Sequence, residues 1–363
     1  MDTGQPLSIV VAGGGTAGHI EPALAVGEVL RDTYGANVVA LGTERGLETS
    51  IVPARGFELQ LIDPVPIPRR QPVKLLGVPA KLTKSVNQTR KVLKDAGAQA
   101  VFGTGGYVAA SAYLAARSLR IPFFVLETNA LAGMANKMGV RLGGTGLNAV
   151  AGSGMDGEVV GIPVRPGVGV DSDGAKAERG YKTFNLDPAR KTLLVTGGSQ
   201  GAVRINQALE GAVDTLVSEG FQVLHAYGRK NDAPPPREHY TALPYIDDME
   251  AALAVADLVV CRSGAMTVAE NSAAGLPAIY VPLPHGNGEQ GLNSAHLVST
   301  GAAVRIDDSE LTSQTLIDTV TAILGDDARL TSMRDALAES GAGDVAEQIA
   351  AKIVAAATNK HTK

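Results

Sequence analysis

Short apolar runs alternate along the chain with longer segments of helical spacing. The runs hold about four to seven residues, which is too short for a helix and typical of buried strands. They lie at residues 7–12, 37–41, 98–102, 122–126, 192–195, 221–227, 243–246, 258–261 and 278–281. Strands that alternate with helices predict βαβ units, and therefore an α/β fold with doubly wound parallel sheets.

Residues 257–282 hold one such unit most completely. Leu258–Cys261 form its first strand, helix formers follow, and Gly275 with Pro277 ends the helix before the second strand. In an open parallel sheet the loop after the first strand faces a ligand crevice, and the free N–H groups of a helix start suit an anion. Glu270, one turn inside this helix, suits the hydroxyls of a ribose. The alternative is an ordinary crossover in which Glu270 binds no ligand.

The strand and helix pattern runs twice along the chain. A glycine-rich loop follows the first strand of each half, at residues 13–19 and 196–202. Residues 159–174 are rich in glycine and aspartate and indicate a linker. The sequence therefore predicts two Rossmann-like domains facing a cleft, an N-terminal domain at residues 1–164 and a C-terminal domain at residues 165–343.

Composition narrows the classes of function. The chain has 363 residues, a formal net charge of −5 and no tryptophan, which disfavours a general nucleic-acid binder. Cys261 is the only cysteine, so neither an internal disulfide nor a cysteine metal cluster can form. No apolar run reaches the ~18 residues of a membrane span, and the N-terminus lacks the basic region of a signal peptide. We therefore expect a cytoplasmic protein with no nucleic-acid partner.

One segment reverses the acidic balance of the chain. Residues 69–94 contain eight basic side chains and no acidic one, with apolar residues interleaved. Such a segment suits an anionic membrane surface, at roughly 1 kcal/mol per basic residue near it. An ordinary solvated helix face is the alternative. The residues expected at the membrane surface are Arg69, Arg70, Lys74, Leu75 and Leu76.

The first glycine loop has two competing interpretations. Gly13, Gly15 and Gly18 match the G-x-G-x-x-G pattern of dinucleotide-binding proteins, but such a site also requires an acid at the end of the second strand. Gly42 and Thr43 stand there instead, with Glu44 just beyond. His19, in the same glycine turn, has the pKa range of a general base for an acceptor hydroxyl. The alternative is that His19 only caps or packs against its helix.

The second half offers the better set of groups for a sugar nucleotide. Two helix N-termini, at residues 199–202 and 264–267, can hold a diphosphate through backbone N–H groups without a metal. Ile246, closing a strand, can receive a uracil ring through its backbone. Gln290 and Asn293 are neutral amides that suit sugar hydroxyls. The Asp171-Ser172-Asp173 run matches a D-x-D metal motif but lies in a loose polar loop, so no metal site is predicted.

Several of these motifs resemble one known family. They are GGGTAGHIEPALAV, the strand-end Glu127 and Asn129, GIPVR, TGGSQGA with Asn206, YIDDM, CRSGAMTVAE, and the pair Gln290 and Asn293. Together they are similar to the MurG family of peptidoglycan N-acetylglucosaminyltransferases, in the correct order from about Ile9 to Ile306.

The resemblance implies the GT-B fold and an inverting, metal-independent hexosyl transfer that uses no cofactor. The donor would be UDP-N-acetylglucosamine (UDP-GlcNAc). The acceptor would be undecaprenyl-diphospho-muramoyl-pentapeptide (lipid I), and the product lipid II, a precursor of the peptidoglycan that shapes and divides the cell. It further implies a peripheral protein on the cytoplasmic face of the cell membrane, with partners among other cell-wall synthesis proteins. A last helix at about residues 344–358 would pack back on the N-terminal, acceptor-binding domain.

The resemblance also assigns residues by matching position. His19 would be the base or position the acceptor, with Glu127 as a second candidate for the base. The family usually has a histidine where this chain has Leu126, and two glycines where it has Ala17 and Gly18. The residues implied in UDP-GlcNAc binding are Thr16, Ala17, Gly18, Asn129, Arg165, Ser199, Ile246, Ala265, Met266, Thr267, Val268, Ala269, Glu270 and Gln290.

Three other functions compete with this one. A processive glycolipid synthase would share the fold. A dinucleotide-dependent dehydrogenase would use Gly13, Gly15 and Gly18, but the missing strand-end acid and the second glycine loop count against it. A sugar-nucleotide-binding protein without catalysis would leave His19 in its glycine turn unexplained.

Overall fold

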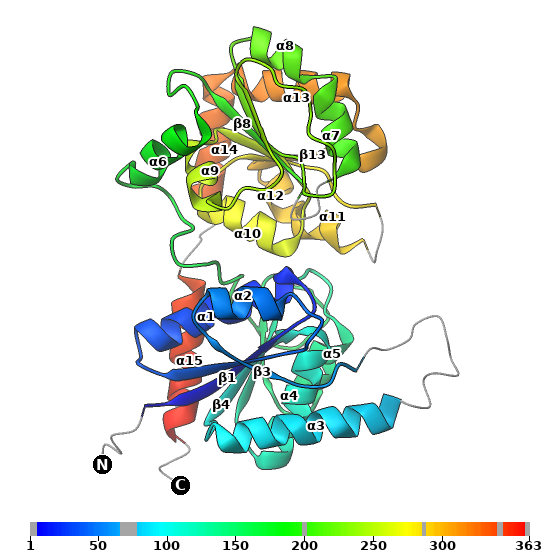
Figure 1. The fold of residues 1–363 in the computed structure, drawn as a ribbon, viewed down its shortest axis with the longest axis vertical. Helices are drawn as coiled ribbons and strands as arrows, with labels where there is room; N and C mark the ends of the chain where they lie inside the picture. Colours follow the sequence, from blue (N-terminus) through cyan, green and yellow to red (C-terminus); the bar gives the residue numbers. More distant parts are fainter. Residues whose placement is uncertain (1–5, 66–77, 198–201, 285–287, 340–343, 360–363) are drawn as a thin grey trace. The chain divides into compact units, whose positions relative to one another are not determined.

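The chain folds into two compact units, each built on one parallel sheet (Figure 1). The first comprises Met1–Pro166 with Gly343–Lys363, and the second comprises Gly167–Ala342. The computed structural model describes residues 6–65, 78–197, 202–284, 288–339 and 344–359. The predicted α/β class, with two Rossmann-like doubly wound domains, is confirmed.

The first unit contains a sheet of seven parallel strands in the order β3-β2-β1-β4-β5-β6-β7. The strands are β1 (Ser8–Gly13), β2 (Asn37–Gly42), β3 (Glu58–Leu61), β4 (Ala100–Gly105), β5 (Phe123–Glu127), β6 (Thr145–Asn148) and β7 (Glu158–Val159). The helices are α1 (Ala17–Asp32), α2 (Glu48–Ala54), α3 (Val78–Asp95), α4 (Gly106–Leu119), α5 (Met134–Arg141) and, from the end of the chain, α15 (Val345–Asn359).

Helices cover both faces of this first sheet. Ile9 and Val11 of β1 belong to one apolar cluster with residues of α1 and α15, while Val10 and Ala12 belong to a second cluster with residues of α4. Because successive side chains of a strand point to opposite faces, a strand buried on both faces must be apolar throughout. This explains why β1 is a continuous apolar run in the sequence.

The chain's last helix, α15, packs on the first unit. It lies against α1 in Figure 1, and Ile349 and Ile353 are fully buried in the same cluster as Ile9 and Ile20. A second tie is the ion pair of Lys352 with Glu158 at 2.8 Å. The chain therefore crosses into the second unit and then returns.

The second unit contains a sheet of six parallel strands in the order β10-β9-β8-β11-β12-β13. The strands are β8 (Thr192–Thr196), β9 (Gln222–Ala226), β10 (Tyr240–Leu243), β11 (Leu258–Cys261), β12 (Ala278–Tyr280) and β13 (Ala303–Arg305). The helices are α6 (Ala175–Phe184), α7 (Val203–Glu210), α8 (Val213–Ser218), α9 (Met249–Val255), α10 (Ala265–Ala273), α11 (Glu289–Asn293), α12 (Ala295–Ser299), the 3₁₀ turn η2 (Asp308–Glu310), α13 (Ser313–Leu324) and α14 (Asp327–Glu339).

The direction of winding reverses once in each sheet. In the first unit it reverses between β1 and β4, and in the second between β8 and β11. Ligands of open α/β sheets bind outside the carboxyl ends of the strands at this reversal point. In the first unit, the loops at the reversal point follow Gly13 and Gly105. In the second unit, the described loop residues at the reversal point follow Thr196 and Cys261.

Three sequence-based bounds were wrong. α1 begins at Ala17 rather than near Pro22, because Thr16 already has the extended conformation of an N-cap, and Pro22 lies inside the helix. β4 runs on through the glycines to Gly105. The strand expected at residues 243–246 is β10 (Tyr240–Leu243), three residues earlier, where Tyr240 rather than Ile246 pairs with β9.

Candidate functional site

The sequence predicts His19 in a loop, but the structure places it in the first turn of α1. Its backbone N–H donates to the Thr16 carbonyl at 3.1 Å, so the helix is already formed at this position. Its side chain is half-buried, whereas Thr16 and Ala17 are exposed. The residue therefore stands at the end of β1, at the reversal point of the first sheet.

The imidazole of His19 is held by one of its two nitrogens. Nδ1 lies 3.2 Å from the carbonyl oxygen of Gly14 and 3.3 Å from the hydroxyl of Thr16. A carbonyl oxygen can only accept, so the contact with Gly14 is a hydrogen bond in the neutral tautomer that carries its proton on Nδ1. This leaves the lone pair on Nε2, the form in which a histidine can act as a base.

The end of β4 fits closely around this ring because it lacks side chains. A methyl group on Gly105 would lie 2.9 Å from Nε2 of His19, and one on Gly106 would lie 2.6 Å from the Gly14 carbonyl oxygen. Their φ angles are +120° and +77°, conformations that favour glycine. The hydroxyl of Thr104 donates to the His19 carbonyl at 2.5 Å. The glycines at the end of β4 and the start of α4 therefore leave the space that the His19 turn occupies.

Glu127 is fully engaged by hydrogen bonds to its own surroundings. It is buried at the end of β5. Its Oε1 accepts from the backbone N–H of Asn129 at 2.9 Å, and its Oε2 accepts from the backbone N–H of Gly133 and the amide of Asn136, each at 2.9 Å. A carboxylate with these bonds shapes the loop after β5 and has little capacity left for a substrate proton.

A buried polar chain extends from this carboxylate. The Asn136 amide also donates to the Leu126 carbonyl at 3.0 Å, and its oxygen accepts from the hydroxyl of Tyr113 at 3.0 Å. Burial, with the charge of Glu127 nearby, raises the pKa of Tyr113 well above its usual value. Tyr113 therefore stays a neutral donor, and every member of the chain is satisfied.

A second buried glutamate, Glu48, is not among the residues predicted from the sequence. It is the first residue of α2 and is fully buried. Its Oε1 accepts from the backbone N–H of Gly15 at 3.0 Å, while no described residue hydrogen-bonds to its Oε2. A glutamate in a short polar segment carries no signal in the sequence, because only the tertiary fold brings α2 against the first glycine loop.

In the second unit, α10 begins directly beyond β11, as predicted. Gly264 is the N-cap, with an extended backbone, and no side chain caps the helix. The first N–H groups of α10 therefore have no side-chain acceptor at the cap, which suits a phosphate oxygen. Glu270 lies one turn further along α10 and is half-buried. The helix residues Ala265, Met266, Thr267, Val268 and Ala269 lie between them.

Interactions beneath α10 hold its start in place. Arg262 donates to Asp308 at 2.5 Å and to the Val281 carbonyl at 3.0 Å, which ties the ends of β11 and β12 to η2. The amide of Asn271 lies 3.4 Å from both the Cys261 sulfur and the Tyr280 hydroxyl. Burial raises the pKa of Cys261 to about 12, so this thiol is an inert core group.

The predicted sugar-binding amides lie on α11. The side-chain oxygen of Gln290 accepts from the Leu283 backbone N–H at 3.0 Å, which leaves its NH₂ group to donate. The Asn293 amide donates to the carbonyl of Ser263, directly before α10, at 3.2 Å. α11 is thus linked to the same strand end as α10.

Ile246 lies beyond the end of β10, in the segment that leads to α9. Its side chain is buried. Asp248 follows as the N-cap of α9 and accepts from the Ala251 N–H at 3.1 Å, as expected, whereas Asp247 is exposed. The backbone of Ile246 is therefore held in place by its buried side chain and by the nearby N-cap residue Asp248.

A buried network supports the helix after the second glycine loop. His225 of β9 contacts the Tyr240 hydroxyl through Nδ1 at 2.7 Å and the Asn206 oxygen through Nε2 at 3.1 Å. Asn206 itself donates to the Tyr227 carbonyl at 2.9 Å. Burial lowers the pKa of His225 to about 4, so the ring is neutral and Nε2 is the donor. The network fixes α7 against two strands.

Only some of the remaining predicted residues lie in the described part of the chain. Ser199 and the membrane-surface residues Arg69, Arg70, Lys74, Leu75 and Leu76 lie outside the described residues. Gly18, Asn129 and Arg165 are half-buried. Of the basic segment, α3 is described. It packs on α4, with Ser85, Thr89 and Leu93 buried, while Lys81, Lys84, Lys91 and Lys94 are exposed. No helix of the described residues is long and apolar enough to span a membrane.

The carboxylates of the D-x-D run serve the backbone. Asp171 accepts from the Ala177 N–H at 2.8 Å and Asp173 from the Ala175 N–H at 3.1 Å, at the start of α6. No cluster of three metal-ligating side chains occurs in the part of the chain that the structure describes.

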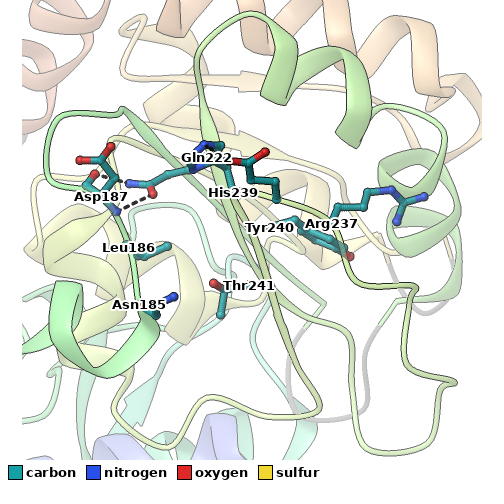
Figure 2. A pocket seen from close by; sticks show the side chains of 9 residues that line it. Asn185, Leu186, Asp187, Gln222, Arg237, His239, Tyr240 and Thr241 are labelled. Carbon is teal, nitrogen blue, oxygen red and sulfur yellow. Dashed lines mark hydrogen bonds and ion pairs between the residues drawn. The ribbon is translucent and has the colours of Figure 1, made fainter.

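A polar hollow in the second unit lies away from the predicted site residues. Figure 2 shows it at the starts of β9 and β10, where the Gln222 amide is hydrogen-bonded to Asp187. Gln222 also donates to Thr192 at 2.9 Å, so its groups are used internally. The hollow is at the amino edge of the sheet, opposite the edge where α/β proteins bind ligands.

Comparisons with known proteins agree with this geometry. The N-terminal domain model of glycosyltransferase family 28 matches residues 9–143, and its C-terminal domain model matches residues 192–349. The chain is 60% identical over 355 residues, 98% of its length, to the whole of a Corynebacterium glutamicum protein named UDP-N-acetylglucosamine–N-acetylmuramyl-(pentapeptide) pyrophosphoryl-undecaprenol N-acetylglucosamine transferase. It is 51% identical over 362 residues to a Nocardia farcinica protein of the same name, with 96% of each chain covered.

Solved structures give the same result. The crystal structure of MurG from Acinetobacter baumannii matches 96% of this chain and 99% of its own, with a TM-score of 0.76 and 29% identity. The calicheamicin glycosyltransferase CalG4, at 16% identity and a TM-score of 0.70, shares the fold. The predicted GT-B fold and the resemblance to MurG are thus confirmed. With family matches over most of its length and relatives of 60% identity, this chain belongs to glycosyltransferase family 28.

Proposed function

We propose that this chain is an inverting glycosyltransferase that moves N-acetylglucosamine from UDP-GlcNAc to lipid I and so forms lipid II for peptidoglycan synthesis. The observation that carries the proposal is the 60% identity, over nearly the full chain, to the Corynebacterium glutamicum transferase. The matched region spans both units, so it covers both sheet reversal points. No cofactor takes part.

The second unit binds the donor in this proposal. The start of α10, beyond Gly264, holds the diphosphate through backbone N–H groups. Glu270 accepts hydrogen bonds from the ribose hydroxyls, and the backbone of Ile246 receives the uracil. Because the Gln290 oxygen is already bonded to Leu283, Gln290 donates its NH₂ group to the transferred sugar. Ser199 completes the diphosphate site, while Asn129 and Arg165 contact the donor from the first unit and the linker.

The first unit supplies the base. The acceptor hydroxyl attacks the anomeric carbon of N-acetylglucosamine, the bond from that carbon to the diphosphate oxygen breaks, and the hydroxyl proton passes to Nε2 of His19. UDP leaves with its negative charge stabilised by the start of α10. His19 suits this step better than Glu127, since Nε2 carries the lone pair in the tautomer that the Gly14 contact favours, while the Glu127 carboxylate accepts from Asn129, Gly133 and Asn136.

The acceptor defines where the protein works. Lipid I carries an undecaprenyl chain, so the enzyme must approach the cytoplasmic face of the cell membrane as a peripheral protein. Residues 69–94, with their eight basic side chains, suit the anionic lipid surface. Other cell-wall synthesis proteins are the expected partners there.

A dinucleotide-dependent dehydrogenase fits the first glycine loop poorly. In such enzymes the backbone N–H groups of this loop face a pyrophosphate. Here the N–H of Gly15 donates to the buried carboxylate of Glu48 at 3.0 Å. That bond occupies an N–H group that a pyrophosphate would need.

The proposal is tested by transfer of radiolabel from UDP-GlcNAc to a lipid I analogue in detergent micelles, with UDP-glucose and NADH as matched controls. The expected product is the acceptor lipid enlarged by one N-acetylglucosamine in β linkage, formed equally well in the presence of EDTA. Label that stays in UDP-GlcNAc, or binding of NADH in place of the sugar nucleotide, would exclude the proposed activity.

A further inference from the structure

Glu48 is an isolated carboxylate in the interior of the first unit. Its side chain is fully buried, and no described residue hydrogen-bonds to its Oε2. Burying such a group carries a large desolvation cost, so its presence requires an explanation. The only side-chain hydrogen bond that ties it to the rest of the described unit runs from the Gly15 N–H to its Oε1, at 3.0 Å.

The fold leaves space for this carboxylate by using glycines around it. A methyl group on Gly14 would lie 2.5 Å from Oε1 of Glu48, one on Gly42 would lie 2.8 Å from its Cβ, and one on Gly46 would lie 1.5 Å from its Oε2. No other residue type fits at these three positions without displacing the glutamate. The first glycine loop and the end of β2 are thus shaped around Glu48.

One peptide group joins Glu48 to His19. The N–H of Gly15 and the carbonyl of Gly14 belong to the same peptide unit. The N–H donates to Glu48 at 3.0 Å, and the carbonyl accepts from Nδ1 of His19 at 3.2 Å. A carboxylate, a peptide unit and an imidazole therefore form one continuous chain of hydrogen bonds.

Such a chain strengthens each of its members. A carboxylate that accepts from a peptide N–H polarises that peptide and makes its carbonyl a better acceptor, most of all in a buried setting of low dielectric. The stronger acceptor stabilises the Nδ1–H form of the histidine. The same bond also fixes the orientation of the ring, as carboxylates do when they bind an imidazole directly.

We propose that Glu48 is a positioning residue that acts on His19 through the Gly14–Gly15 peptide group and keeps its proton on Nδ1 and its lone pair on Nε2. The inference about the tautomer stands on geometry alone. Its consequence for catalysis rests on the proposed function, in which Nε2 of His19 receives the acceptor proton.

Few other ionisable groups approach this chain. From α4, the hydroxyl of Tyr107 would lie 3.9 Å from a methyl group on Gly15. Glu127, at the end of β5, is separated from His19 by the amide of Asn136, which binds Glu127 and lies near Gly105. Neither contacts the Gly14–Gly15 peptide in the described residues, so Glu48 is the ionisable side chain that acts on it.

The test is nitrogen NMR of protein labelled with ¹⁵N-histidine, with the His19 signals assigned by their loss in His19→Asn. In the wild type we expect a protonated Nδ1 and a bare Nε2 at neutral pH. In Glu48→Gln, which keeps an oxygen for the Gly15 N–H but lacks the charge, the Nε2-protonated form should become detectable. The control is Glu28→Gln. Glu28 lies on α1 well beyond His19, and its buried carboxylate is paired with Arg55, so this variant should show the same His19 nitrogen signals as the wild type.

Kinetics of the same variants separate this inference from the proposed function. Glu48→Gln should lower kcat about 10-fold, in the range known for groups that orient a functional imidazole, with both KM values unchanged. A protonated Nε2 in the wild type, or identical tautomers in wild type and Glu48→Gln, would overturn the inference whatever the rates. A tautomer change without a change in kcat would support the link but contradict His19 as the base.

Discussion

Three glutamates show how surroundings decide the role of one residue type. Glu127 binds donors of its own loop, Glu48 binds one peptide group, and Glu270 lies half-buried on a helix near its start. The first two have their carboxylates inside the protein, where they order backbone. Glu270, in contrast, is partly exposed, and in the proposed function it binds the ribose hydroxyls.

Replacing Glu270 with Gln should weaken donor binding. A hydrogen bond to a charged group contributes about 1.5–3 kcal/mol and one to a neutral group about 0.5–1.5 kcal/mol, so loss of the charge alone should raise the KM for UDP-GlcNAc roughly 5-fold to 10-fold while kcat changes little. Steady-state kinetics with varied donor would measure it. Glu178→Gln, at an exposed residue of α6, is the control. An unchanged donor KM would remove Glu270 from the ribose site.

Replacing Glu127 with Gln should affect stability more than chemistry. The new NH₂ group would face donors, either the Asn129 N–H or those of Gly133 and Asn136, so buried hydrogen bonds are lost. We expect a loss of about 1–3 kcal/mol in the free energy of unfolding, measured in urea. The reverse pattern, full stability with a kcat reduced to background, would make Glu127 the base.

At the scale of elements, the sequence predicts buried parallel strands well and contacts between distant segments poorly. β11 and α10 have the expected starts because apolar runs and Gly264 mark them in the sequence. The α1 start was missed because Pro22 is a common first-turn residue. Glu48 was missed because its role depends on a glycine loop 33 residues away.

The network that joins α7 to β9 and β10 should make stability depend on pH. The pKa of His225 is lowered to about 4 by burial, from an ordinary value of 6.5. Between these values the unfolded chain binds a proton that the folded chain does not, so the free energy of unfolding should fall as the pH falls from about 6.5 to about 4.

Urea unfolding across that pH range would measure the effect. His225→Gln retains polar contacts to Asn206 and Tyr240 but cannot titrate, so its stability should vary less over the same range. Carboxylates such as Asp248, whose pKa is lowered by its bond to Arg179, contribute mainly at still lower pH. Equal pH slopes in wild type and variant would contradict the role given to His225.

At the scale of the whole molecule, the two units divide the work. In the proposed function, the second unit provides the start of α10, Glu270 and Gln290 for the donor, while the first provides His19 for the acceptor hydroxyl. Neither unit alone holds both groups of residues, so each should be inactive without the other.

Reversing the charge of Arg69, Arg70 and Lys74 to Glu should weaken binding to vesicles that contain anionic lipid. Each basic residue near such a surface contributes roughly 1 kcal/mol, and the difference should shrink as salt screens the charges. Vesicle sedimentation at two salt concentrations would measure it, with uncharged phosphatidylcholine vesicles as control. Equal binding by wild type and variant would refute the membrane-surface assignment.

The most direct test of the account is the single-turnover rate of N-acetylglucosamine transfer from UDP-GlcNAc to a lipid I analogue, measured for wild type and His19→Ala at saturating substrates. We expect lipid II from the wild type and a rate lower by roughly 10²–10⁴ in the variant, the range for loss of a general base, with UDP binding unchanged. Absence of transfer by the wild type would contradict the function, and equal rates would contradict His19 as its base.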